Sequence, residues 1–165
     1  MMGTVKWWDV LRLVICIVVC QLAGVIGSVF TVKSIPTWYA ALQKPPFTPP
    51  NWLFGPAWVT LYLLMAVAAF LVWRKGLGDR QVGWALITFL IQLVLNALWS
   101  VVFFGLRSPF GGVIVIVGLW VAILFTIIRF FRISIASGAL LLPYIAWVSF
   151  ATTLNVSIWL LNPQA

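Results

Sequence analysis

The sequence predicts an all-α integral membrane protein: a five transmembrane helix bundle with a long proline-rich first loop, forming a single domain over residues 1–165. Composition is the first reason, because 64% of the 165 residues are hydrophobic and 7% are charged, against about 25% charged in ordinary soluble domains. The second reason is that five uncharged apolar segments each approach or exceed the roughly 20 residues that a helix needs to cross a bilayer. Backbone groups find no water in hydrocarbon, so these segments must be helical.

The predicted spans are residues 13–32, 52–73, 82–104, 110–128 and 139–161. The first span follows basic residues, as the apolar core of a secretory signal peptide also does. It is longer than the roughly 7–15 residues of such a core, so we expect it to stay in the protein as a helix. Connections two to four are short, which predicts antiparallel neighbouring helices. Pro143 lies in the last span and is expected to loosen its first turns.

The first connection, residues 33–51, is long and rich in proline. Its prolines are Pro36, Pro45, Pro46, Pro49 and Pro50, and the aromatic residues Trp38, Tyr39 and Phe47 lie among them. Proline fixes φ and has no N–H to donate, so this stretch is not expected to continue a helix. We interpret it as a stiff aromatic cap on one end of the bundle. The alternative is a rigid linker with no other role.

The basic residues predict the orientation in the membrane. Seven lie at the N-terminus and in the second and fourth connections: Lys6, Arg12, Arg74, Lys75, Arg80, Arg129 and Arg132. The other side has three: Lys33, Lys44 and Arg107. The positive-inside rule therefore predicts a cytoplasmic N-terminus. Basic residues this sparse and scattered do not indicate nucleic-acid binding.

The acidic and nucleophilic residues exclude most familiar active sites. The chain has no His and no Glu, and its only acidic residues are Asp9 and Asp79. A carboxylate pair, a Ser-His-Asp triad and a common oxygen-ligand metal cage cannot be built from them. Cys16 and Cys20 lie four residues apart in one apolar run, which is typical of buried packing residues. We therefore expect no metal site and no catalysis by protein acids or bases.

Three spans each carry one polar or aromatic face at helical spacing. The third has Gln92, Asn96, Trp99 and Ser100, the fifth has Tyr144, Trp147, Ala151 and Asn155, and the second has Trp58 and Tyr62. Amide side chains are costly in hydrocarbon unless hydrogen-bonded, so these faces should point into the bundle. An aromatic-walled cavity with a few amide groups suits a large, flat, mostly apolar ligand. The alternative is interhelical hydrogen bonding without a ligand.

The remaining spans and tryptophans predict contacts at the surface of the bundle. Trp73, Trp84 and Trp159 lie near the ends of spans, where tryptophan commonly anchors a helix at the membrane interface. The fourth span is almost wholly aliphatic and is expected to face lipid or a partner subunit. In the first span, the pairs Ala23/Gly27 and Gly24/Ser28 predict close helix approach.

Four sequence motifs resemble those of the translocator protein family (TspO/MBR), also called tryptophan-rich sensory proteins or peripheral-type benzodiazepine receptors. The motifs are Trp38-Tyr39 with Lys44-Pro45-Pro46-Phe47-Thr48-Pro49-Pro50, then Gly55-Pro56-Ala57-Trp58, then Gln92-Leu93-x-Leu95-Asn96-x-x-Trp99 with Phe103-Phe104-Gly105, and finally Pro143-Tyr144-x-Ala146-Trp147-x-x-Phe150-Ala151-Thr152-Thr153-Leu154-Asn155. The resemblance covers nearly the whole chain.

The resemblance implies a five-helix bundle, usually a homodimer, with no required cofactor. It also implies a pocket beneath the first loop for porphyrin and haem-related tetrapyrroles, sterols and benzodiazepine-site ligands. Trp58 and Trp147 match a pair implicated in light-dependent porphyrin breakdown. The animal sterol-recognition pattern is absent from residues 154–159, which argues against sterol binding through that element. The short C-terminus is similar to bacterial members and implies a bacterial cell membrane.

From the faces and the resemblance together, we predict eleven ligand-binding residues. They are Trp38, Tyr39, Trp58, Tyr62, Gln92, Asn96, Trp99, Tyr144, Trp147, Ala151 and Asn155. The predicted function is a membrane receptor or sensor that binds tetrapyrroles. Two alternatives are a transporter of porphyrins or sterols and an enzyme that degrades porphyrin in light, with Trp58 and Trp147 as its candidate catalytic residues.

Overall fold

The computed structural model describes residues 7–164. Within them, five helices are long and apolar enough to cross a membrane, which confirms the predicted all-α, five-span fold class. The spans are α1 (Trp7–Ser34), α3 (Asn51–Trp73), α4 (Arg80–Ser100) with a π-helical turn (Val101–Gly105), α5 (Pro109–Ile133), and α6 (Ile135–Ala139) followed by α7 (Leu142–Leu161). Lys6, which we counted for orientation, lies outside the described residues.

All five spans extend beyond their predicted ends, and two extend farthest. Helix α1 begins at Trp7 rather than at residue 13, and α5 continues past residue 128 to Ile133. In both cases the added turns contain charged residues, Arg12 in α1 and Arg129 with Arg132 in α5. The predicted spans were defined as uncharged segments, so each prediction stops at the first charged residue. A helix can continue into the polar interface, where water and headgroups solvate the charge.

The proline-rich connection contains one helical turn that the sequence did not predict. This turn, α2 (Trp38–Ala41), lies between Pro36, two residues after α1 ends, and Pro45. The intervening residues contain no proline, so one turn can form there. Residues 42–50 are not helical, as expected.

The last span is interrupted before Pro143. Residues 140 and 141 form a turn between α6 and α7, and Pro143 is the second residue of α7. Proline is well accommodated in the first turn of a helix, where its missing N–H would have no intrahelical partner. The expected loosening is therefore a break between two helices rather than a kink within one.

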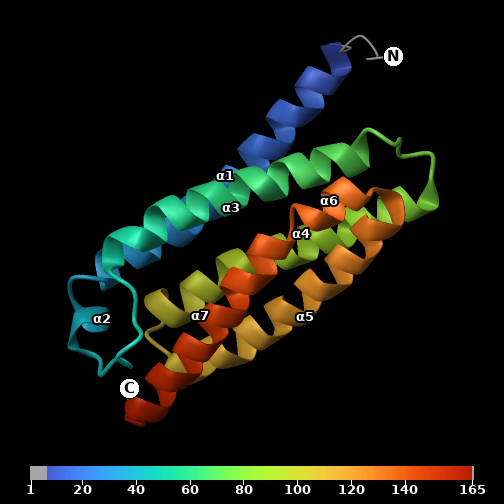
Figure 1. The fold of residues 1–165 in the computed structure, drawn as a ribbon. Coiled ribbons are helices and arrows are strands. Elements are labelled where there is room, and N and C mark those ends of the chain that lie inside the picture. Colours follow the sequence, from blue (N-terminus) through green and yellow to red (C-terminus); the bar gives the residue numbers. More distant parts are fainter. Residues whose placement is uncertain (1–6, 165) are drawn as a thin grey trace.

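The long helices pack side by side as a bundle, with α1 against α3 and α4, α4 against α5, and α5 against α7 (Figure 1). Close approach depends on glycine in α1, as the small-residue pairs predicted. A Cβ atom on Gly24 would lie 2.5 Å from the Tyr62 ring, and one on Gly27 would lie 2.9 Å from Ser100 Oγ. Helix α2 and the end of α7 lie at the same end of the bundle, and the start of α1 lies at the other (Figure 1).

Helix α5 has both an inner and an outer face. Gly112, Ile116 and Leu119 are buried on its inner face, whereas Ile114 and Phe125 are exposed. The expectation that this aliphatic helix faces lipid or a partner therefore applies to its outer stripe. Its inner stripe belongs to the core of the bundle.

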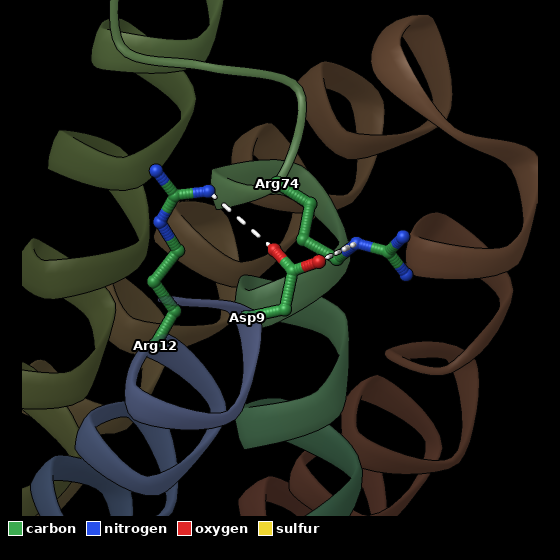
Figure 2. Close-up of polar contacts among 3 residues, drawn as sticks. All are labelled: Asp9, Arg12 and Arg74. Atoms are coloured by element: carbon green, nitrogen blue, oxygen red, sulfur yellow. Dashed lines mark ion pairs between the residues drawn. The ribbon is translucent and has the colours of Figure 1, made fainter. Parts of the chain in front are cut away.

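The start of α1 is held to the end of α3 by a shared carboxylate. Asp9 pairs with both Arg12 and Arg74 (Figure 2). Its carboxylate lies 3.6 Å from a nitrogen of Arg12 and 3.7 Å from Nε of Arg74. The Arg12 guanidinium also lies over the Trp73 ring, 5.9 Å from its centroid. Exposed ion pairs contribute about 0–1 kcal/mol, so this contact positions the helix ends more than it stabilises the fold.

Candidate ligand-binding cavity

A cavity of about 470 Å³ lies between α1, α3, α7, the end of α4 and its π-helical turn, and Tyr39 of α2 borders it at the loop end. This volume is within the usual range of small-molecule sites, about 300–1,000 Å³. Seven of the eleven predicted binding residues line it: Tyr39, Trp58, Tyr62, Trp99, Trp147, Ala151 and Asn155. The other four, Trp38, Gln92, Asn96 and Tyr144, are not among its lining residues.

The aromatic walls come from α3 and α7. The Trp58 ring stacks on the Tyr62 ring with centroids 5.6 Å apart, and Trp147 meets Phe54 edge-on at 6.1 Å. Within the described part of the chain, the buried Nε1 of Trp147 has no hydrogen-bond partner. A buried, unpaired donor costs free energy. Because Nε1 has almost no accessible surface, it does not face the open volume of the cavity.

Trp99 and Asn155 form a second, fully hydrogen-bonded wall. Trp99 Nε1 donates to Asn155 Oδ1 at 3.0 Å, and Asn155 Nδ2 donates to the carbonyl oxygen of Pro109 at 2.9 Å. The Trp99 ring also stacks on Phe103, with centroids 5.3 Å apart. These contacts fix the Trp99 ring at the cavity edge and join α4, α5 and α7.

Three of the four residues that do not line the cavity form a hydrogen-bond network behind it. Tyr62 Oη donates to Asn96 Oδ1, Asn96 Nδ2 donates to Tyr144 Oη at 3.0 Å, and Tyr144 Oη donates to Gln92 Oε1 at 2.8 Å. Gln92, Asn96 and Tyr144 are all buried, as their inward faces predicted. The network meets the cavity through Tyr62. Direct contact of Gln92, Asn96 or Tyr144 with a ligand stays a prediction.

Loop residues and the π-helical turn cover one end of the cavity. Tyr39 is 3% exposed and packs against the rings of Phe103 and Phe104, and Trp38 packs edge-on against Phe103. Burial raises the pKa of the Tyr39 phenol above its usual value, so the group is neutral at physiological pH. The Lys44 ammonium lies 4.8 Å from the centroid of the Tyr39 ring, where cation–π attraction holds it.

Phe103 and Phe104 are lining residues that we did not predict as binding residues. They are consecutive, so a regular helix would point them in directions about 100° apart, and helical periodicity alone could not place both on the cavity. The π-helical turn changes this spacing, and Ser34 Oγ donates to the Phe104 carbonyl oxygen at 2.7 Å. The only sequence signal for these residues was their place in the resembling motif.

The cavity reaches the surface of the bundle between α1 and α3. Every exposed lining residue comes from these two helices, including Val25 at 57% and Val59 at 51% exposure. A Cβ on Gly55 would meet nothing within 4 Å. Both helices are long and apolar enough to span a membrane, so we expect this side of the cavity to face lipid. An apolar ligand dissolved in the bilayer could therefore contact it directly.

The chemistry of the lining favours binding over acid–base catalysis. Among the residues that border the cavity, all within residues 7–164, none is Lys, Arg, Asp or Glu. What it offers is aromatic surface and small residues on α1. These groups can hold a flat apolar molecule.

Comparison with known proteins identifies relatives along most of the chain. The family model described as the TspO/MBR family matches residues 16–160. The tryptophan-rich protein TspO of Archaeoglobus fulgidus is 46% identical over 155 residues, which cover 93% of this chain and 99% of the relative. The human translocator protein is 37% identical over 136 residues, 81% of this chain and 80% of the relative. The tryptophan-rich sensory protein of Cereibacter sphaeroides is 37% identical over 126 residues, 76% and 77% of the two chains.

Proposed function

The chain belongs to the TspO/MBR family of integral membrane proteins, and we propose that it is a receptor or sensor that binds tetrapyrroles such as porphyrins in the cavity under the first loop. The observation that carries the proposal is an uncharged cavity with Trp58, Trp99 and Trp147 in its walls. A porphyrin is large and flat, so its faces can stack on these rings.

The cellular setting is part of the same proposal. Six of the seven basic residues that we counted on the N-terminal side lie in the described chain, around the ends of α1, α3, α4 and α5. We propose that this end faces the cytoplasm of a bacterial cell and that the protein works as a homodimer. No cofactor is needed for binding of this kind, and the tetrapyrrole is the ligand. Sterol binding is a weaker proposal, because the animal-type recognition pattern is absent.

Titration with protoporphyrin IX tests the function. Bound porphyrin should quench tryptophan fluorescence saturably, because the cavity is lined by four of the eleven tryptophans. Ala151→Leu, which adds bulk inside the cavity, should weaken binding about tenfold through overpacking. Ala146→Leu is the matched control, because Ala146 is an exposed residue of the same helix. The proposal is wrong if quenching is not saturable in the wild-type protein, or if both variants bind equally.

Light-dependent porphyrin breakdown is a second candidate function. It is favoured by the position of Trp58 and Trp147, which both line the cavity and could each donate one electron to an illuminated porphyrin, with dissolved dioxygen as the oxidant that takes up electrons and opens the ring. The porphyrin absorbance should then decay faster in light when the pigment is bound than when it is free in matched micelles. Trp58→Phe and Trp147→Phe, compared at saturating porphyrin, should slow the decay. Decay at the same rate in all samples would leave binding as the only function. No feature of the cavity favours transport in the same way.

A further inference from the structure

Asn162, the residue that follows α7, clasps the backbone of the first loop. Its Nδ2 donates to the carbonyl oxygen of Gln43 at 2.8 Å, and its Oδ1 accepts a hydrogen bond from the Gln43 N–H at 2.9 Å. Nδ2 also donates to the carbonyl oxygen of Ile158 at 2.8 Å. One side-chain amide thus pairs with both backbone groups of a loop residue while it stays bonded to the last turn of its own helix.

This clasp is the loop's polar link to the rest of the bundle. The other side-chain hydrogen bonds of residues 35–50, all within the described chain, stay inside the loop or reach the end of α1. Beyond them, the loop is held by aromatic packing, such as Phe47 on Phe150. Residues 43 and 162 are far apart in sequence, so the clasp connects the loop to the helix that carries Trp147 and Ala151.

The position of the clasp relates it to the cavity. Gln43 is four residues after Tyr39, whose buried ring closes the loop end of the cavity, and the Lys44 ammonium rests on that ring. If the loop detached from α7 at Gln43, Tyr39 would lose its support on that side. Ligand contacts at this end of the cavity would then weaken.

We propose that Asn162 is a positioning residue that holds the first loop, with Tyr39, against the cavity and so sets how long a bound ligand stays. This inference rests on the proposed function. The role belongs to the amide of Asn162 and the backbone of Gln43, and the Gln43 side chain takes no part in it. Replacing the Gln43 side chain is therefore a matched control for replacing Asn162.

The test compares Asn162→Ala with Gln43→Ala. Asn162→Ala removes both hydrogen bonds to the loop, so protoporphyrin IX should dissociate roughly fivefold faster in stopped-flow measurements, as expected for the loss of about 1 kcal/mol. Gln43→Ala keeps both backbone groups and should dissociate at the wild-type rate. An unchanged rate in Asn162→Ala, or equal acceleration in both variants, would overturn the proposal.

A measurement without ligand separates this inference from the proposed function. Hydrogen exchange of the Gln43 backbone amide should be faster in Asn162→Ala than in the wild type, because the variant lacks the oxygen that accepts this hydrogen bond. The exchange rates of amides in the middle of α3 should be unchanged. Unchanged exchange at Gln43 would show that the clasp does not hold the loop. If exchange responds but no porphyrin binds to any variant, the clasp stands and the proposed ligand is wrong.

Discussion

Replacing Trp147 by phenylalanine should weaken porphyrin binding about tenfold, and Trp58→Phe should weaken it by a comparable factor. Phenylalanine keeps an aromatic ring but is smaller than the indole, so each variant presents less surface to a flat ligand. The loss of part of the stacking area amounts to about 1–1.5 kcal/mol, which corresponds to roughly a tenfold change in affinity.

Trp159→Phe is the control for this comparison. Trp159 lies near the end of α7, packs against Phe110 with ring centroids 5.1 Å apart, and is not a lining residue. Its replacement should leave porphyrin affinity unchanged, because the altered group is outside the cavity. Affinities are best measured from porphyrin absorbance, since each variant removes one emitting tryptophan. If all three variants bind like the wild type, the ligand does not occupy this cavity.

The number and class of the helices could be predicted because a bilayer imposes a length and an apolar composition on each span. The ends of the helices could not, because charged residues such as Arg12 and Arg132 continue a helix into the interface. The helical turn α2 was also missed. It is one turn long, and its one buried residue, Tyr39, is covered by packing on distant rings such as Phe103 and Phe104.

The sequence predicts which helix faces point into the bundle, but not which residues on those faces border the cavity. Spacing along a helix shows that Asn96 and Trp99 point inward, yet it cannot show whether an inward side chain meets empty space or another helix. Trp99 borders the cavity, whereas Asn96 lies between two tyrosines from α3 and α7. Two small residues of α1 border the cavity although the sequence did not predict it. Gly24 and Ser28 were predicted only as packing contacts, and they also line the cavity.

Asn96→Leu should lower stability strongly while changing porphyrin affinity little. The change removes the acceptor of the Tyr62 hydroxyl and the donor to Tyr144 in a buried network. An interhelical hydrogen bond in a membrane contributes about 0.6 kcal/mol on average, and a buried hydroxyl left without its partner costs about 1–3 kcal/mol. We therefore expect a loss of about 1–3 kcal/mol, measured by thermal or denaturant unfolding in detergent.

Asn155→Leu is the matched comparison, because Asn155 is the same residue type, is equally buried, and borders the cavity. It should lower both stability and affinity, since its loss frees Trp99 Nε1 and releases the Trp99 ring from its fixed position. The ratio of affinity loss to stability loss should thus be larger for Asn155→Leu than for Asn96→Leu. The reverse order would mean that a ligand reaches past Tyr62 to the amide of Asn96, and that the network opens on binding.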